Sequence, residues 1–192
     1  MNKFLKAVLY SSLIKRINRL VLSLFYDKKY LQGKFFDEQR YGFVWAWRGI
    51  FRSIMNRRRG IRWPISKGCR IPNGLNIIFD PSSLNVFQQP GTYFQSFNGK
   101  ITIGRDVWIA QNVGIITENH NPTNPDNHLP AKDVFIGDGC WVGMNAVVLP
   151  GVTLGNHTTV GAGSIVTHSF PGNCVIAGNP AKIIRQLNCE EQ

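Results

Sequence analysis

Aliphatic residues recur at every sixth position through the second half of the chain. Between residues 134 and 168 this series comprises Ile136, Val142, Val148, Leu154, Val160 and Val166. Two places before each of them stands a small or β-branched residue: Val134, Cys140, Ala146, Val152, Thr158 and Ser164. Glycine follows the aliphatic residue directly at Gly137, Gly143, Gly155 and Gly161. A six-residue period is neither helical nor a plain strand alternation, and it indicates a hexapeptide β-helix repeat.

This repeat predicts a mainly β protein built as a parallel β-helix. Each hexapeptide supplies one short strand and one turn, and a triangular coil closes after three of them. The aliphatic residue points to the axis, and glycine follows where a Cβ would crowd the chain or where φ is positive. Stacked coils bury a column of Val, Ile and Leu that one coil cannot bury alone. An ordinary Gly-rich sandwich would not keep so many consecutive positions in phase.

The predicted solenoid begins irregularly, after a boundary at residues 63–64. The residue before a proline leaves the helical region, so Trp63-Pro64 ends the preceding helical segment. A six-residue spacing then links Ile65, Ile71 and Ile77, and it fails through residues 80–90. It returns with Phe97, Ile103, Ile109 and Ile115. Irregular first coils are typical of a terminal repeat.

Residues 117–133 interrupt the ladder with three prolines, four asparagines and two histidines. No strand or helix is predicted here, and the segment is interpreted as a loop ejected from one coil. A polar loop that leaves a rigid scaffold is a typical place for function.

The chain leaves the repeat after residue 170. Turns are predicted at Pro171-Gly172 and Asn179-Pro180, and Pro180 suits the first turn of a short C-terminal helix. Lys182 and Arg185 would share a face of that helix. The predicted domains are therefore a helical segment over 1–62, a β-helix over 63–170 and a tail with a short helix over 171–192.

Residues 4–26 and 40–62 predict two amphipathic helices. In the first, the aliphatic face carries Leu9, Leu13, Ile17, Leu20 and Leu24, and Lys15, Arg16 and Arg19 cluster on the other face. In the second, one face carries Phe43, Trp47, Ile50, Phe51 and Ile54, with charge from Arg48, Arg52 and the run 57–59. Basic residues break the apolar run of the first helix, so it is not expected to cross a bilayer. No small-residue cleavage site follows it.

The net charge of +11 is concentrated in these helices. Residues 1–62 hold 15 of the 22 Lys and Arg and only three acidic residues, whereas residues 63–192 hold 7 basic and 8 acidic residues. Basic, aromatic-rich amphipathic helices suit a membrane surface. They would equally serve as a cap packed on the open end of the solenoid. Nucleic-acid binding is not expected, because no nucleic-acid-binding motif accompanies the arginine run.

The cysteines Cys69, Cys140, Cys174 and Cys189 have no metal-ligand spacing, and no metal site is predicted. All four are interpreted as reduced thiols of a cytoplasmic protein, peripheral on the inner face of the membrane if the helices bind lipid. Cys140 occupies an inward repeat position, which suits a small buried hydrophobe better than a nucleophile.

Residues 134–185 resemble the hexapeptide-repeat acyltransferase family. The branch to which they are most similar is the sugar and polysaccharide O-acetyltransferases of capsule, O-antigen and colanic-acid synthesis, alongside maltose and galactoside acetyltransferases. The motifs that carry the resemblance are IGRDVWI (103–109), IGDGCWVG (136–143), LPGVTLG (149–155), VGAGSIVT (160–167) and AGNPAK (177–182). The resemblance implies a left-handed β-helix, a homotrimer, and acetyl-CoA bound in a groove between neighbouring solenoids.

The resemblance also implies site residues. The family's general base is a histidine in the ejected loop, and His120 stands at that position. The residues that match its cofactor contacts are Trp141, Met144, Ala162, Thr167, His168, Lys182 and Arg185. The family often has lysine where this chain has His168. Acceptor-side roles fall to Asn98, Glu118 and His128, and Glu118 is also a candidate to orient the base.

A histidine suits this chemistry on general grounds. A sugar hydroxyl is a poor nucleophile at neutral pH, and a base that titrates near the operating pH takes its proton as the oxygen attacks the thioester carbonyl. Turn N–H groups at coil corners would stabilise the oxyanion. Direct transfer in a ternary complex, with no acyl-enzyme, is expected.

The expected function is therefore acetyl-CoA-dependent O-acetylation of a glycan or lipid-linked glycan. The alternatives are N-acetylation of an amino sugar nucleotide, a serine-type small-molecule acetyltransferase, and a non-catalytic solenoid scaffold. A zinc enzyme of the γ-class carbonic anhydrase type is disfavoured, because the four histidines lack the spacing for a three-histidine site.

Overall fold

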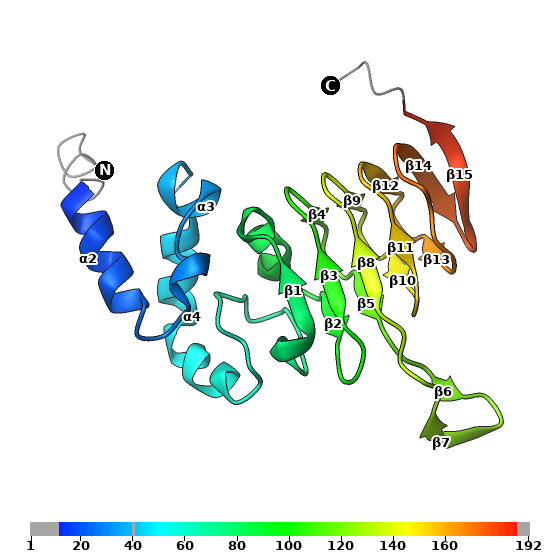
Figure 1. Ribbon diagram of the computed structural model, residues 1–192, viewed down its shortest axis with the longest axis horizontal. Helices are drawn as coiled ribbons and strands as arrows, with labels where there is room; N and C mark the ends of the chain where they lie inside the picture. The colour runs from blue at the N-terminus through cyan, green and yellow to red at the C-terminus, as the bar shows by residue number, and fades with distance from the viewer. Residues whose placement is uncertain (1–11, 40, 188–192) are drawn as a thin grey trace. The chain divides into compact units, whose positions relative to one another are not determined.

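The computed structural model describes residues 12–39 and 41–187 (Figure 1). The chain divides into two compact units, Met1–Ile65 and Ser66–Gln192. The helices described in the first unit are α2 (Ser12–Leu22), η1 (Lys28–Tyr30), α3 (Lys34–Asp37) and α4 (Tyr41–Arg57). Among the described residues, no helix is both long enough and apolar enough to cross a bilayer.

Helix α4 packs into the first unit through small and polar residues. Its buried residues are Gly42, Ala46, Gly49, Ser53 and Asn56. A Cβ added at Gly42 would lie 2.5 Å from the ring of Phe36, and one added at Gly49 would lie 2.9 Å from the hydroxyl of Tyr26. The helix therefore approaches its neighbours closely. Phe43 and Trp45 pack against Phe36 and Phe35, and most of its other large apolar side chains are exposed.

Large apolar side chains are exposed along both long helices. In and just after α2 they are Leu13, Ile17, Leu20 and Leu24, and on α4 they are Tyr41, Val44, Trp47, Phe51, Ile54 and Met55. Phe51 is 87% exposed, whereas Phe43 and Ile50 are half-buried. The predicted apolar face is therefore exposed over the described part of the first helix, whereas only Trp47, Phe51 and Ile54 of the face predicted for the second are exposed. Leu9 lies outside the described residues.

The second unit consists mainly of three sheets, whose strands pair in parallel except for β15; we number the sheets in the order in which the chain visits them from β3 onward. Sheet I contains β1 (Ile77–Phe79), β3 (Ile101–Ile103), β8 (Val134–Ile136) and β11 (Thr153–Leu154). Sheet II contains β4 (Trp108–Ile109), β9 (Trp141–Val142), β12 (Thr158–Val160), β14 (Cys174–Gly178) and β15 (Ala181–Gln186). Sheet III contains β2 (Tyr93–Gln95), β5 (Gly114–Ile116), β10 (Val147–Val148) and β13 (Ile165–Val166).

Strands one coil apart pair in parallel. Thr153 pairs with Phe135, Thr159 with Trp141, and Ile165 with Val147. Each partner lies eighteen positions earlier, which is three hexapeptides. The three sheets therefore fit the predicted β-helix, and the bends between them define a I–II, a II–III and a III–I corner.

The core follows the six-residue ladder. All twelve predicted inward residues between 134 and 166 are buried. The glycines after the aliphatic residues are required by the approach of the next coil: a Cβ added at Gly155 would lie 2.1 Å from the carbonyl oxygen of Pro171. Positive φ occurs elsewhere in the corners, as at Gly139 and His157.

The I–II corner is held by a ladder of polar side chains. Asp138 accepts a hydrogen bond from the N–H of Arg105 at 2.8 Å and pairs with the Arg105 guanidinium at 2.7 Å. The N–H of Asp138 donates to the Asn156 side chain at 2.9 Å. The hydrogen bonds from the backbone and side chain of Arg105 hold the pKa of Asp138 below its ordinary 3.8.

The first coil departs from the regular pattern. The helix η3 (Pro81–Gln88) stands where the chain would otherwise form a strand of sheet II, and the short helix η2 (Gly74–Asn76) precedes β1. Phe97, predicted to point inward, is 47% exposed. Phe94 and Ser96 are buried instead, and the Ser96 hydroxyl donates to the carbonyl of Asn73 at 2.8 Å.

The predicted C-terminal helix is wrong. Residues 181–186 form β15, which pairs antiparallel with β14. Strand β14 itself pairs with β12, so sheet II continues beyond residue 170. The turn at Asn179-Pro180 was read as a helix start, but it reverses the chain onto an available sheet edge, where backbone hydrogen bonds favour a strand.

Candidate active site

The ejected loop leaves the solenoid at the III–I corner, between β5 and β8. It forms a short antiparallel hairpin of β6 (His120–Asn121) and β7 (Asn124–His128), which projects from the stack of coils (Figure 1). No strand was predicted in this polar segment. The base of the loop is closed by the N–H of Lys132, which donates to the carbonyl of Thr117 at 2.8 Å.

The hairpin register places His120 opposite His128. Their ring centroids are 4.2 Å apart. The Nδ1 atom of His120 lies 2.6 Å from the carbonyl oxygen of Pro125. A carbonyl oxygen only accepts, so the neutral ring of His120 carries its proton on Nδ1 and has its lone pair on Nε2.

A buried carboxylate lies beneath the hairpin. Glu118 is 4% exposed, and its Oε2 accepts a hydrogen bond from the Asn98 amide at 2.9 Å. Its Oε1 lies 3.9 Å from Nδ1 of His128. Glu118 therefore contacts both other predicted acceptor-side residues, while the bonded partner of His120 is the backbone carbonyl of Pro125.

Gln95 anchors the root of the loop, and the sequence reasoning missed it. Its side-chain oxygen accepts from the N–H groups of Thr117 and Glu118, each at 3.0 Å. The only feature of the sequence that could have indicated this role is that Gln95 is a polar residue one coil before the loop. That coil is irregular, so the six-residue phase that would assign Gln95 to an outer position is lost there.

The predicted cofactor residues lie at three places on the single chain. Trp141, Lys182 and Arg185 belong to sheet II, Met144 and Ala162 lie at the II–III corner, and Thr167 and His168 lie at the III–I corner. All seven are exposed. Only Thr167 and His168 share the corner from which the His120 loop leaves, and their side chains contact each other at 3.2 Å.

A β-bulge between Lys182 and Arg185 determines that their side chains project from the same face of the sheet. Lys182 pairs with Ala177 and Arg185 pairs with Val175, with a register shift between them. Ala177 and Val175 lie two apart on β14 and so share a face, and directly opposed residues share a face too. The two cations therefore project from one face of sheet II, as predicted, although on a strand.

The thiol of Cys140 is unsuited to nucleophilic attack. Burial raises its pKa to about 11, and burial raises that of Cys69 to about 12. The thiolate is the nucleophile, and these thiols are protonated at neutral pH. Among the described residues, no group of His, Cys, Asp and Glu is arranged to hold a metal ion.

Sequence comparison supports the resemblance drawn from the motifs. The family Bacterial transferase hexapeptide (six repeats) matches residues 133–168. The putative lipopolysaccharide biosynthesis O-acetyl transferase WbbJ of Escherichia coli K12 is 44% identical over 102 residues, covering 47% of this chain and 52% of that protein. Galactoside O-acetyltransferase of the same organism is 38% identical over 91 residues, covering 46% and 45%. The chain thus spans about half the length of these curated relatives.

Solved structures show the same fold over nearly the whole chain. A maltose O-acetyltransferase from Clostridium difficile 630 has a TM-score of 0.54 at 23% identity, covering 94% of this chain and 91% of that chain. A hexapeptide-repeat acetyltransferase from Vibrio cholerae, in complex with acetyl coenzyme A, has a TM-score of 0.54 at 22% identity, covering 94% and 92%. The predicted resemblance to hexapeptide-repeat acyltransferases is confirmed.

Proposed function

We propose that this protein is an acetyl-CoA-dependent O-acetyltransferase that acetylates a sugar hydroxyl of a surface polysaccharide or its lipid-linked precursor. The repeat family and the names of the relatives support acyl transfer to a sugar. The observation that carries the proposal is His120: its Nδ1 is held by a carbonyl in a loop that leaves a hexapeptide coil.

In the proposed reaction, Nε2 of His120 takes the proton of the acceptor hydroxyl. The oxygen attacks the thioester carbonyl, a C–O bond forms, and the C–S bond to coenzyme A breaks as the tetrahedral intermediate collapses. The imidazolium returns its proton to the leaving thiolate, so atoms and charge balance without an acyl-enzyme. A general base of this kind contributes about 10²- to 10⁴-fold to the rate.

Acetyl-CoA would bind to the outer surface of the solenoid. Lys182 and Arg185 would neutralise its phosphates through charge-assisted contacts. On one chain the His120 loop and the II–III corner residues Met144 and Ala162 lie at different corners. This division favours a homotrimer of left-handed coils, in which a groove between two copies joins both corners, with Asn98, Glu118 and His128 on the acceptor side.

The helices of residues 1–62 would bring the enzyme to the inner face of a membrane. The exposed aliphatic face that runs from Leu13 to Leu24 and the exposed aromatic side chains of α4 support this assignment. Apolar faces flanked by Lys and Arg are typical of interfacial helices. A membrane-bound enzyme would meet a lipid-linked glycan at the surface where that acceptor resides.

The experiment is acetyl-CoA-dependent thiol release by the full chain, with membrane glycan extract as acceptor and mass spectrometry of the products. We expect release that requires the extract, and an acetyl ester on the glycan. Acetylation of amino sugars alone would contradict O-transfer. The proposal that the protein is an enzyme would be contradicted if the wild type and His120→Ala both bind acetyl-CoA and neither releases thiol with any glycan.

A further inference from the structure

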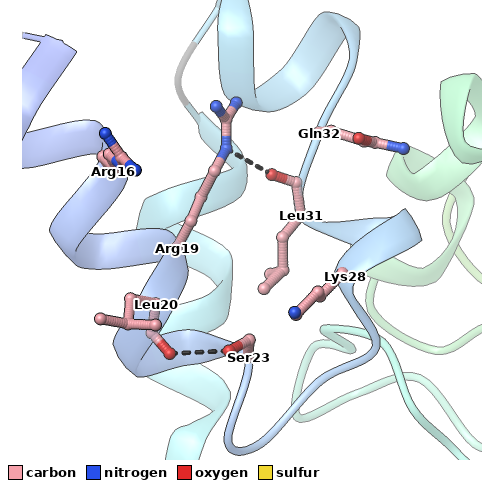
Figure 2. Close-up of a pocket in the computed structure, with 7 residues that line it drawn as sticks. All are labelled: Arg16, Arg19, Leu20, Ser23, Lys28, Leu31 and Gln32. Atoms are coloured by element: carbon pink, nitrogen blue, oxygen red, sulfur yellow. Dashed lines mark hydrogen bonds between the residues drawn. The ribbon is translucent and has the colours of Figure 1, made fainter.

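A pocket of about 370 Å³ lies in the helical unit between α2 and the segment 28–32 (Figure 2). Its lining residues are Arg16, Arg19, Leu20, Ser23, Lys28, Leu31 and Gln32. Most of the surface that lines the pocket is apolar, although three of its seven residues are cationic. None of these residues belongs to the candidate active site.

One network fixes the two walls of the pocket to each other. Arg19 on α2 donates from Nε to the carbonyl of Leu31 at 2.9 Å and pairs with Asp37. Asp37 also accepts from the N–H of Gly33 at 2.7 Å. Burial raises the pKa of Asp37, but the hydrogen bonds from Arg19 and Gly33 outweigh it and hold that pKa below its ordinary 3.8. The pocket is therefore a built feature of the fold.

Two cations at the pocket have no acidic partner among the residues that the structure describes. Arg19 is engaged by Asp37, but within the described ranges 12–39 and 41–187 neither Arg16 nor Lys28 forms an ion pair. Both are exposed. In Figure 2 the Lys28 amino group is directed toward Leu20 and Ser23, across the space that Leu31 lines. Two such cations on the lining of a pocket whose surface is mainly apolar favour a ligand that is both anionic and apolar.

The apolar wall runs into the exposed aliphatic face of α2. Leu31 is 2% exposed and forms the inner part, whereas Leu20 is 71% exposed and belongs to the face that also carries Ile17. A hydrocarbon chain that leaves the pocket past Leu20 would therefore remain on apolar surface. A free phosphate ion would leave this wall unused.

We propose that this pocket binds the terminal phosphate of an anionic membrane lipid such as phosphatidic acid. Arg16 and Lys28 hold the phosphate, and Leu20 and Leu31 contact the first part of the hydrocarbon. The inference rests on the proposed membrane contact and deepens it, because it names lipid phosphates as the class of membrane molecule recognised.

The first test titrates the purified full chain with short-chain dihexanoyl phosphatidic acid below its micelle concentration, by calorimetry. Loss of a charge-assisted contact should weaken binding roughly tenfold in Arg16→Gln and in Lys28→Gln. The matched controls Arg57→Gln and Arg58→Gln change the same charge on exposed positions outside the pocket, and they should bind as the wild type does. Equal weakening in all four variants would overturn the proposal.

The apolar half of the site is tested by Leu20→Gln against Leu24→Gln. Both leucines are similarly exposed, at 71% and 66%, but only Leu20 lines the pocket. Only Leu20→Gln should weaken binding of the short-chain lipid. Inorganic phosphate should compete poorly; competition at the same concentration as the lipid would mean a simple anion site and overturn the lipid assignment.

A vesicle arm separates this proposal from the proposed function. At equal surface charge, vesicles with phosphatidic acid should bind the full chain better than vesicles with phosphatidylglycerol, and Arg16→Gln/Lys28→Gln should remove that difference. Equal binding to both kinds of vesicle would mean that only general electrostatic attraction acts, and it would contradict lipid binding in the pocket. Acetyl transfer to a soluble glycan should be unchanged in these variants, so its failure would concern the active site instead.

Discussion

Lys182 and Arg185 lie three residues apart on β15, yet a β-bulge turns them to the same face of sheet II. In a regular strand an odd spacing would separate them. The bulge thus gives the last strand of the solenoid a pair of neighbouring cations on an exposed surface.

If these cations bind the phosphates of coenzyme A, Lys182→Gln and Arg185→Gln should each raise the Kd for coenzyme A about tenfold, because one charge-assisted contact is lost. Isothermal titration checks this. Lys67→Gln, an exposed cation elsewhere on the same unit, is the control. Unchanged affinity in both β15 variants would place the cofactor elsewhere.

The close approach of successive coils predicts a contrast between two glycines. In Gly155→Ala the new Cβ meets the backbone of Pro171 and one coil must shift, so the free energy of unfolding should fall by about 1–3 kcal/mol. In Gly114→Ala the nearest atoms lie at 3.7 Å, an ordinary contact, and the loss should be small. Urea unfolding measures both. Equal losses would contradict the packing argument.

The Arg105–Asp138 pair predicts a loss of stability in acid. The folded-state pKa of Asp138 lies below the 3.8 of the unfolded chain, so the pair stabilises the fold above pH 3.8, and this contribution is lost as pH falls through the lowered pKa. Asp138→Asn keeps an oxygen for the N–H of Arg105 but loses the charge.

The variant should therefore show a shallower fall of unfolding free energy between neutral pH and the acid range. Denaturant titrations at several pH values give that slope. A slope as steep as in the wild type would show that other carboxylates account for the acid sensitivity.

The raised thiol pKa values predict unreactive cysteines. With pKa values of about 11 and about 12, Cys140 and Cys69 hold about one thiolate in a thousand or fewer at pH 8. In a Cys174→Ser/Cys189→Ser background, which leaves Cys69 and Cys140 as the thiols, a disulfide reagent should label the native chain only after denaturant is added. Rapid labelling of the folded protein, with loss of acetyl transfer, would restore Cys140 as a candidate nucleophile.

The regular coils could be predicted because their packing is local and periodic. Each step from Ile136 to Val166 repeats the same requirement for an inward aliphatic, so one pattern determines many contacts. The first coil breaks this pattern: the six-residue spacing back from Ile103 selects Phe97 as the inward residue, but Phe94 fills the core and Phe97 lies outside. The last strand was mistaken for a helix because its conformation depends on pairing with β14, which a local turn signal does not reveal.

The sequence predicted only those parts of the candidate site that consist of characteristic side chains. A polar loop that leaves a repeat singled out His120 and its neighbours. The contact of His120 with Pro125 involves a backbone carbonyl, which has no sequence signature, and Gln95 lies in a coil without regular phase. The small buried face of α4 likewise emerges only from packing, because Gly42 and Gly49 carry no side chain that would mark a helix face in the sequence.

The account depends most on His120, and the turnover number of His120→Ala tests it most directly. With saturating acetyl-CoA and glycan, kcat should fall about 10²- to 10⁴-fold, while the Kd for acetyl-CoA should stay near that of the wild type. Asp126→Asn, in the same exposed hairpin, should keep both values. A His120→Ala enzyme that retains the wild-type kcat would contradict the proposed mechanism.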